Sequence, residues 1–280
     1  MATIIDGKQV SNKIREKIKQ DVDALKQKGI TPKLAVILVG EDSASKIYIR
    51  NKSIACENVG ICYEEYLLSE NIEMSELLNL IDKLNNDESI HGILLQSPLP
   101  KHLDANLAFK NITSKKDVDG FNPVNVGKLC LGQETFVSCT PFGIIKMLED
   151  YNIELEGKNA VILGRSNIVG KPMIQCLLNK NATVTVCHSK TKEIEKFTKQ
   201  ADIIIAAIGK TKFLKPDMVK EGAIVIDVGI NRDEEGKISG DADFENLLSK
   251  VSYITPVPGG VGPMTITMLM YNVVKAAKQQ

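Results

Sequence analysis

The sequence predicts an α/β fold built from two units, and three observations support this. Apolar, strand-like runs alternate with amphipathic helical periodicity along almost the whole chain. The predicted strands are nearly continuous in apolar residues, which is typical of a parallel sheet covered by helices on both faces. The alternation stops in an irregular stretch after residue 123, and it restarts at residue 158. We therefore expect two α/β units joined near residue 140.

The composition is typical of a soluble globular protein. Of the 280 residues, 43% are hydrophobic and 25% are charged, and 35 basic residues balance 35 acidic ones. This balance argues against binding to nucleic acid or to a membrane surface, and neither a signal segment nor a run of membrane-spanning length is visible. The six cysteines show no CxxC pair or zinc-finger spacing, so we expect no metal site and buried free thiols. A cytoplasmic location is expected for the same reason.

The N-terminal unit begins with an amphipathic helix that closes at Gly29, a typical helix C-cap. Beyond it, short apolar runs bounded by glycine or proline indicate strands, and apolar residues three or four apart indicate helices. In chain order, these patterns predict helix 8–29, strand 33–40, helix 43–60, strand 62–68, helix 74–86, strand 90–96, helix 102–112 and a connecting helix 141–152.

The C-terminal unit is predicted from four apolar strands with helical segments between them. These strands are 158–164, 182–188, 201–209 and 223–230, and a hairpin is expected at 231–240. A last helix, 264–278, follows this unit in sequence, and periodicity alone leaves open which unit it packs against.

The segment after the first of these strands, GRSNIVGKP, has the features of a phosphate-binding turn. Gly164 permits a tight turn, Gly170 permits close approach of helix and strand, and the amides at the helix start are expected to face an anion. Ser166 occupies the second glycine position of the usual G-x-G-x-x-G motif. A plain strand-to-helix turn is the alternative interpretation.

The end of the next strand, 182–188, favours NADP over NAD. An NAD site usually carries an acidic residue there, which binds the ribose 2′-hydroxyl. This chain has His188, Ser189 and Lys190 instead. Together with Arg165, these side chains suit a 2′-phosphate, and a solvated basic loop is the alternative.

The last two strands of this unit also end at glycine. Because ligands bind at the carboxyl ends of the strands in such sheets, we expect Gly209, Gly229 and Ile230 to border the nicotinamide half of the cofactor. Asp227 either contacts a ligand or fixes a loop.

In the N-terminal unit, a lysine interrupts the apolar face of the predicted helix 43–60. At about 100° per residue, Lys52 lies among Tyr48, Ala55 and Val59, on the face expected to be buried. A break of this kind indicates a functional site. A lysine whose stem is buried while its ammonium reaches water is the alternative.

Two further polar features stand at element ends in this unit. Gln96 closes the strand 90–96 before a rigid SPLP turn, and Asp117 and Asp119 lie beside Gly120. Each has a structural alternative, namely fixing a loop or shaping a turn. Spacing alone does not show whether these side chains converge with Lys52.

These motifs resemble those of the bifunctional methylenetetrahydrofolate dehydrogenase/methenyltetrahydrofolate cyclohydrolase family. The segments that match, in the family's order, are YIRNK, LLQSPLP, DVDGFNPVNVGKL, CTPFGI, GRSNIVGKP, CHSKT, VIDVGIN and PVPGGVGPMT. One departure is visible, because Ser97 stands where the family commonly has leucine, while Gln96 is retained.

The resemblance implies a catalytic folate-binding domain of residues 1–139 plus 264–280, to which the C-terminal helix returns. It also implies an NADP-binding Rossmann domain of residues 140–263, and a homodimer. The positions that match folate-binding or catalytic residues of the family are Tyr48, Lys52, Gln96 and Asp119, with a backbone wall near the substrate from Pro258, Gly259 and Gly260. The positions that match cofactor contacts are Gly164, Arg165, Ser166, Ser189 and Ile230.

The implied activity is NADP-dependent oxidation of 5,10-methylenetetrahydrofolate to 5,10-methenyltetrahydrofolate, followed by hydrolysis to 10-formyltetrahydrofolate in one-carbon metabolism. Hydride transfer removes no proton and requires orientation, whereas hydrolysis requires protons to move. We expect Lys52 to move them, because burial and a nearby cation disfavour its ammonium form. Tyr48 is expected to orient Lys52, Gln96 to hydrogen-bond it, and Asp119 to bind the donor pair of the pterin.

Two alternatives stay open at this point. The first is a dehydrogenase with little cyclohydrolase activity, in which the methenyl compound accumulates. The second is a non-enzymatic module that binds NADP or folate without turnover.

Overall fold

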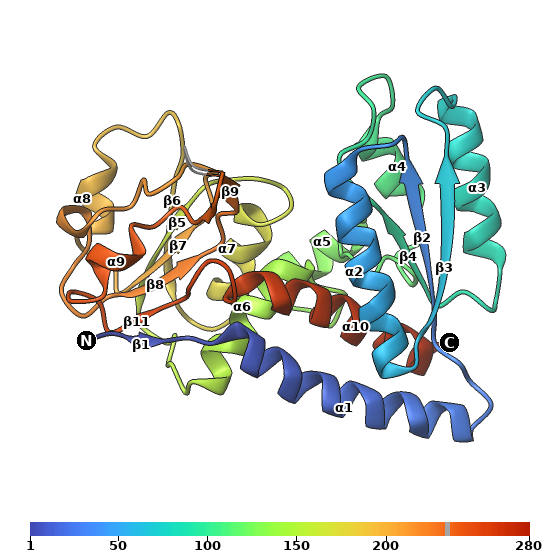
Figure 1. Cartoon of the computed structure of the whole chain (residues 1–280), viewed down its shortest axis with the longest axis horizontal. Coiled ribbons are helices and arrows are strands. Elements are labelled where there is room, and N and C mark those ends of the chain that lie inside the picture. Colours follow the sequence, from blue (N-terminus) through green and yellow to red (C-terminus); the bar gives the residue numbers. More distant parts are fainter. Residues whose placement is uncertain (233–235) are drawn as a thin grey trace. The chain divides into compact units, whose positions relative to one another are not determined.

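The computed structural model describes residues 1–232 and 236–280 and contains two compact units (Figure 1). The six-stranded unit consists of Met1–Asn12 and Ser138–Thr265, and the three-stranded unit consists of Lys13–Val137 and Ile266–Gln280. The main sheet of each unit is parallel, with helices between its strands. The predicted α/β class with two units is therefore confirmed.

The three-stranded unit is an open parallel sheet with helical connections. Its elements are β2 (Lys33–Val39), α2 (Ser43–Val59), β3 (Cys62–Leu68), α3 (Met74–Asn86), β4 (Gly92–Leu95), α4 (Ala105–Asn111) and α5 (Pro123–Cys130). The strand order is β3-β2-β4, and both neighbours run parallel to β2. Buried residues occupy β2 almost throughout, as expected for a central strand covered on both faces.

Helices α3 and α4 pack on one face of this sheet. Ile37 of β2 shares a buried cluster with Leu77 and Ile81 of α3 and Ala108 of α4. Because side chains alternate across a strand, Ile37 and its neighbours two positions away face these helices, and the residues between them face the other side. In Figure 1, α2 and α3 flank this sheet on opposite sides.

The six-stranded unit is a larger parallel sheet with strand order β1-β11-β8-β7-β5-β6. Its elements are β1 (Thr3–Ile4), α6 (Cys139–Asp150), β5 (Asn159–Leu163), α7 (Gly170–Leu178), β6 (Thr183–Cys187), α8 (Ile194–Thr198), β7 (Ile203–Ala206), the 3₁₀ helix η1 (Pro216–Met218), β8 (Ile224–Asp227), α9 (Phe244–Leu247) and β11 (Tyr253–Ile254). The short strands β9 (Asn231–Arg232) and β10 (Ile238–Ser239) form a separate antiparallel pair. The expected hairpin is thus present, and its residues 233–235 lie outside the described part of the chain.

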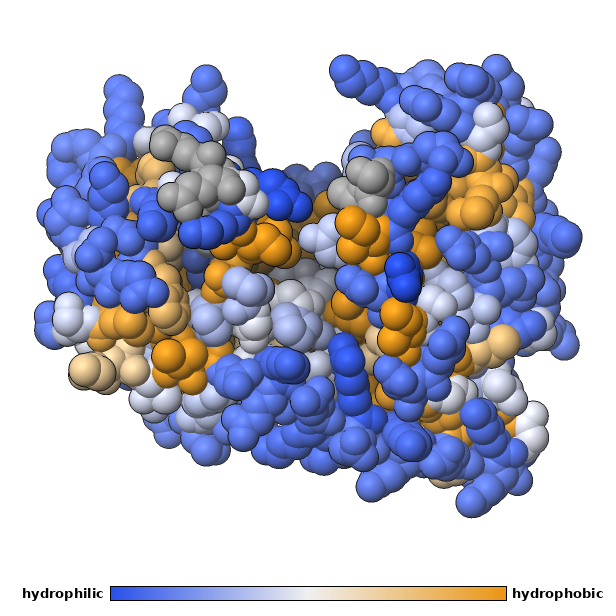
Figure 2. Space-filling model, viewed as in Figure 1, coloured by the Kyte–Doolittle hydropathy of each residue, from blue (hydrophilic) through white to orange (hydrophobic). Residues whose placement is uncertain are grey.

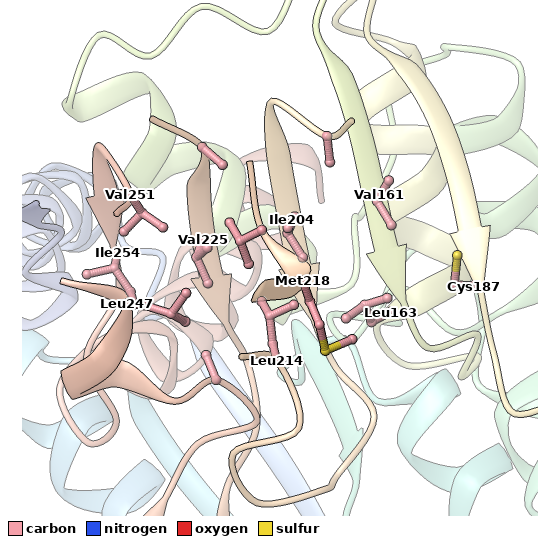
Figure 3. Packing of buried hydrophobic residues seen from close by; sticks show 14 residues of the cluster. Val161, Leu163, Cys187, Ile204, Leu214, Met218, Val225, Leu247, Val251 and Ile254 are labelled. Carbon is pink, nitrogen blue, oxygen red and sulfur yellow. The ribbon is translucent and has the colours of Figure 1, made fainter. Parts of the chain in front are cut away.

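A buried cluster covers one face of the six-stranded sheet (Figure 3). Val161, Ile204, Val225 and Ile254 come from four different strands and share this cluster with Leu247 of α9. The strands are therefore fixed side by side by one continuous apolar layer, and their carboxyl ends emerge at a common edge.

The first twelve residues group with the six-stranded unit rather than with the rest of the N-terminal segment. Thr3 pairs with Tyr253 and Ile4 pairs with Ile254 in the parallel β1–β11 ladder. This pairing adds β1 to the edge of the larger sheet. Because β1 and β11 have only two residues each, neither gives a periodic pattern from which it could be predicted.

Helix α10 (Val261–Gln279) returns to the three-stranded unit, as the family resemblance implied. Asn272 Nδ2 donates to Val118 O at 2.8 Å and to Val137 O at 3.2 Å. Val273 lies against Gly92 of β4, where an added Cβ would stand 3.2 Å from its side chain. At the opposite end of the chain, α1 (Gly7–Gln27) is a long amphipathic helix.

The face of the molecule in Figure 2 is mostly hydrophilic, with hydrophobic residues in small groups. Among the described residues, none of the helices combines the length and the apolar character needed to cross a membrane.

Candidate functional site

Helix α2 carries Lys52 on its packed face. Its buried residues share one face of the helix, and they are Ser45, Ile49, Ala55, Cys56 and Val59. Lys52 falls in this row, three residues after Ile49 and four before Cys56, and it is half-buried. The position of Lys52 on the packed face therefore agrees with the sequence pattern.

Lys52 and Gln96 are directly hydrogen-bonded. Lys52 Nζ donates to Gln96 Oε1 over 2.9 Å. Gln96 follows β4, and its backbone N–H donates to Ile37 O at 2.9 Å. Its side-chain Nε2 donates to Ser97 O at 2.7 Å. Because the amide nitrogen is held by Ser97, the amide oxygen faces the lysine.

Asp119 lies in a turn that follows a bridge to β4, the strand after which Gln96 stands. A parallel bridge joins Ile93 of β4 to Asp117, and Gly120 N donates to Asp117 O at 3.2 Å, so the chain turns directly after the bridge. Asp119 is half-buried and precedes Gly120, whose φ of 72° permits the turn. Asp119 therefore belongs to a turn that begins beside β4, and its convergence with Lys52 and Gln96 stays a prediction.

Asp117 fixes this turn from within. Its buried carboxylate accepts from Phe121 N at 3.1 Å, Asn122 N at 2.8 Å and Asn125 Nδ2 at 2.7 Å. Burial raises the pKa of Asp117, and these hydrogen bonds act in the opposite direction. The structural role expected for Asp117 agrees with these contacts.

Tyr48 differs from the expectation. It lies one turn before Lys52 on α2, but its side chain is 43% exposed. Its neighbour Ile49 takes the buried position instead, because the packed row of α2 passes through Ser45, Ile49 and Lys52. The prediction that Tyr48 lies on the buried face is therefore wrong.

The six-stranded unit contains a cavity of about 450 Å³ at the carboxyl ends of β5, β6 and β7. Its lining residues are Leu163, Gly164, Arg165, Ser166, Cys187, His188, Ser189, Thr191, Ile194, Ala207, Ile208, Lys210 and Phe213. Among these described residues, the charged ones are Arg165 and Lys210, and both are basic. The cavity therefore contains five of the predicted cofactor-binding residues and suits an anionic ligand.

Glycine is required at two positions of the turn after β5. Gly164 has a φ of 117°, and a Cβ there would overlap the carbonyl oxygen of Ala207. At Gly170, a Cβ would stand 2.5 Å from Gly164 O. These contacts explain the close approach of α7 to the strand, as the motif predicted.

The hydroxyl of Ser166 contacts the start of α7. Its Oγ accepts from Val169 N at 3.1 Å and Gly170 N at 3.4 Å. The amide of Val169, which precedes α7, and the first amide of α7, at Gly170, therefore donate to the serine hydroxyl. The phosphate-binding role of this helix start stays a prediction.

The loop after β6 is held by its own side chains. His188 N donates to Thr191 Oγ1 at 2.9 Å, and Lys190 N donates to His188 Nδ1 at 3.2 Å. Ser189 and Thr191 line the cavity within this turn. The imidazole of His188 accordingly acts as an acceptor that shapes the loop.

The remaining predicted cofactor residues lie outside the lining of this cavity. Gly209 follows β7 and has a φ of 70°, while Gly229 and Ile230 follow the neighbouring strand β8, with Ile230 exposed. Asp227 at the end of β8 fixes a loop, because its buried carboxylate accepts from Gly229 N at 2.9 Å and from two further backbone amides. The loop-fixing alternative for Asp227 is thus the one that the contacts support.

The predicted backbone wall precedes α10 in the six-stranded unit. Gly259 O accepts from Lys8 N at 3.1 Å, and Gly260 N donates to Pro256 O at 2.9 Å. Pro258 and Gly259 form a turn in which Gly259 has a φ of 104°. These residues therefore pack against the first turn of α1, whereas Lys52 and Gln96 belong to the three-stranded unit.

Sequence reasoning missed several residues that line the cavity, notably Thr191, Lys210 and Phe213. Lys210 directly follows Gly209, which is predicted to border the nicotinamide, so its place in the sequence was a usable signal. Lys210 Nζ lies 5.9 Å from the ring centre of Phe213.

Two family models match this chain, one in each part of the sequence. A model of the tetrahydrofolate dehydrogenase/cyclohydrolase catalytic domain matches residues 5–119. A model of the NAD(P)-binding domain of the same family matches residues 138–280. The two models together cover well over half of the chain.

Similar proteins extend over the full length of the chain. Bifunctional protein FolD of Campylobacter jejuni is 58% identical over 279 residues, which is 99% of each chain. A crystal structure of bifunctional FolD methylenetetrahydrofolate dehydrogenase/cyclohydrolase from Campylobacter jejuni has a TM-score of 0.99 at 57% identity and covers 100% of this chain and 99% of that one. The enzyme of Trypanosoma brucei, solved with NADP and an inhibitor, has a TM-score of 0.95 at 36% identity, with 99% and 98% coverage. The chain therefore belongs to the tetrahydrofolate dehydrogenase/cyclohydrolase family.

Proposed function

We propose that the chain is a bifunctional enzyme of one-carbon metabolism. It oxidises 5,10-methylenetetrahydrofolate to 5,10-methenyltetrahydrofolate with NADP, and it hydrolyses that product to 10-formyltetrahydrofolate. The observation that carries this proposal is the hydrogen bond between Lys52 Nζ and Gln96 Oε1, which is 2.9 Å long and lies directly after β4. Both halves of the chain match the family that performs this chemistry.

The residues of the six-stranded unit fit NADP. The cavity of about 450 Å³ is lined by Gly164, Arg165 and Lys210. Gly164 has no side chain, so a ligand can approach the backbone there, and the other two residues are basic. Arg165, His188 and Ser189 would hold the 2′-phosphate, since guanidinium, imidazole and hydroxyl groups can all donate to its oxygens. When bound, the nicotinamide accepts the hydride. Gly209, Gly229 and Ile230 are assigned to the border of the nicotinamide half.

The three-stranded unit, residues 13–137 and 266–280, is assigned to the folate, and the six-stranded unit is assigned to NADP. Asp119 suits the pterin, whose amino group and adjacent ring N–H form a donor pair that a carboxylate accepts. Pro258, Gly259 and Gly260 supply backbone groups near the substrate. These assignments rest on the positions that match the family.

In the oxidation, the folate loses a hydride from its one-carbon bridge and becomes the methenyl cation. No proton leaves in this step, so the chain contributes by binding and orienting the substrate. Tyr48 and Gln96 are assigned to this orientation, each close to Lys52 in sequence or in space.

In the hydrolysis, water attacks the methenyl carbon, a proton leaves that water, and a proton reaches the ring nitrogen as the ring opens. Lys52 is the proton carrier in this proposal, because a nearby cation and partial burial favour the neutral amine. Gln96 Oε1 accepts a hydrogen bond from Lys52 Nζ in either charge state, so it holds the nitrogen in place throughout.

An assay at two wavelengths tests the function. The protein is mixed with methylenetetrahydrofolate and NADP, and NADPH and the methenyl compound are followed together. NADPH formation without lasting accumulation of the methenyl compound is expected. Accumulation of the methenyl compound instead indicates a dehydrogenase with little cyclohydrolase activity, and binding of both ligands without NADPH indicates a non-enzymatic module.

We also propose that the chain is a cytoplasmic homodimer, on the strength of the family resemblance. Size-exclusion chromatography with light scattering should give twice the chain mass of 30.7 kDa. The monomer mass at micromolar concentration would contradict the dimer.

A further inference from the structure

Asp241 is a buried carboxylate that belongs to none of the motifs above. It lies just after β10 and is 0% exposed. Its Oδ2 accepts from Ile208 N at 2.6 Å and Gly209 N at 3.0 Å. Its Oδ1 accepts from Lys210 N at 2.8 Å and Asn231 Nδ2 at 2.8 Å. Three consecutive backbone amides therefore converge on one side chain.

The segment that Asp241 holds is a wall of the NADP cavity. Ile208 and Lys210 both line that cavity, at the carboxyl end of β7. Successive amides that point to one spot form a concavity suited to an anion. In this chain the three amides bind the Asp241 carboxylate, which belongs to the protein itself. These hydrogen bonds therefore fix the loop and are not directed at a bound ligand.

Glycine at two positions allows the carboxylate to reach this place. A Cβ at Gly229 would overlap the Asp241 carboxylate, and a Cβ at Gly240 would overlap the carboxylate of Asp227. Asp227 in turn accepts from Asp241 N at 2.9 Å and Ala242 N at 2.8 Å. The end of β8 thus positions Asp241, and Asp241 positions the end of β7.

We propose that Asp241 is a positioning residue for the cofactor, which fixes the Ile208–Lys210 wall and with it the basic side chain of Lys210 at the cavity. The inference rests on the proposed NADP binding. Asp241 lies behind the loop and acts on affinity through three hydrogen bonds to it. The Asp241 carboxylate accepts from the loop amides, and Lys210 lines the cavity with its Nζ 5.9 Å from the ring centre of Phe213.

Asp241→Asn tests this role with little change in volume. The asparagine keeps one oxygen, but its NH₂ group faces amides that themselves donate, so at least one charge-assisted hydrogen bond is lost. We expect KM for NADP to rise about 10- to 100-fold, the range for losing one such bond. The kcat at saturating NADP should stay within about threefold, and hydrolysis of methenyltetrahydrofolate supplied directly should be unchanged, because the catalytic groups are untouched.

Asp202→Asn is the matched control. Asp202 also anchors a backbone amide, accepting from Asn159 N at 2.9 Å, and it precedes β7 at the opposite end of that strand. It should lower the melting temperature while leaving KM for NADP at the wild-type value. If KM for NADP rises equally in Asp241→Asn and Asp202→Asn, the rise reflects general destabilisation of the fold, and the proposal is overturned.

Calorimetric titration with NADP gives the affinity independently of turnover. A wild-type KM and Kd in a folded Asp241→Asn variant overturn the proposal. If this variant does not fold, Asp241→Glu replaces it, because glutamate keeps the charge and displaces the carboxylate by one methylene. An unchanged Kd for NADP in Asp241→Glu also overturns the proposal. Absence of NADPH formation by the wild type, in contrast, would count against the proposed function itself.

Discussion

Replacing Lys52 with methionine tests whether this side chain carries the proton of the hydrolytic step. Methionine has nearly the length of lysine and no ionisable group, so it fills the half-buried position on α2 while removing the 2.9 Å hydrogen bond to Gln96. The free energy of unfolding should fall by about 1 kcal/mol for one such hydrogen bond. This corresponds to a Tm decrease of about 2–4 °C in a chain of this size, so the variant should fold.

The two activities should respond differently to this change. Loss of a proton-transfer group typically lowers a rate by about 10²–10⁴-fold, which is about 2.7–5.5 kcal/mol of activation free energy. We expect hydrolysis of methenyltetrahydrofolate to fall by this factor. Oxidation of methylenetetrahydrofolate should fall by less than about 10-fold, because hydride transfer depends on orientation.

The assay supplies methenyltetrahydrofolate directly and follows the loss of its absorbance, after subtraction of the enzyme-free reaction. Lys46→Met is the matched control, because Lys46 lies on the same helix, forms an ion pair with Glu41 and has a side chain that is 47% exposed. Both activities of this control should equal those of the wild type. Hydrolysis at the wild-type rate by folded Lys52→Met would refute the assignment, and equal loss of both activities would make Lys52 an orienting group.

Three further predictions concern the six-stranded unit. Arg165→Gln should lower the preference for NADP over NAD, as a ratio of kcat/KM values, by about 10-fold or more, and an unchanged ratio in steady-state kinetics would contradict the 2′-phosphate role. Gly164→Ala should raise KM for NADP and lower Tm, because the added Cβ would overlap Ala207 O. Gly157→Ala is the control: Gly157 has a φ of 71°, but no atom lies within 4 Å of the added Cβ, so only Tm should change. Burial raises the pKa of Asp227 to about 6 from an ordinary value of 3.8, so between these pH values the folded protein keeps a proton that the unfolded chain has lost. This contribution to the free energy of unfolding is present below about pH 4 and is lost as the pH rises through about 6. The loss of stability on Asp227→Asn, measured by urea unfolding, should therefore be smaller at pH 7 than at pH 4, by up to about 3 kcal/mol. An equal loss at both pH values would refute this.

Elements with strong periodicity were predictable from the sequence, and very short ones were not. The strand Cys62–Leu68 and the helix Met74–Asn86 have the predicted limits, because apolar spacing and local polar boundaries define them. Helix α5 was missed, although Asn122 caps it and Pro123 occupies its first turn, because eight residues with a central glycine give little periodic signal. The pairing of β1 with β11 was invisible, since each strand has two residues and its partner is distant in sequence.

The candidate site shows the same division between local and long-range information. The inward position of Lys52 was readable from the spacing of its helix, and the family resemblance supplied Gln96 as its partner. The exposure of Tyr48 depends on which neighbouring elements cover that flank of α2, which periodicity does not contain. Asp241 was missed because its hydrogen-bond donors at Ile208–Lys210 precede it by about thirty residues and are backbone groups, which carry no side-chain signature.

The division of each unit between two chain segments has a consequence for synthesis on the ribosome. β1 emerges first, but its partner β11 follows about 250 residues later, so the N-terminal segment stays unpaired while the whole three-stranded sheet is made. That sheet in turn receives Ile266–Gln280 only after the six-stranded unit has been translated. A premature stop before Ile266 would therefore leave all strands of both sheets in the chain, and it would remove the helix whose Asn272 and Val273 pack in the unit that holds Lys52.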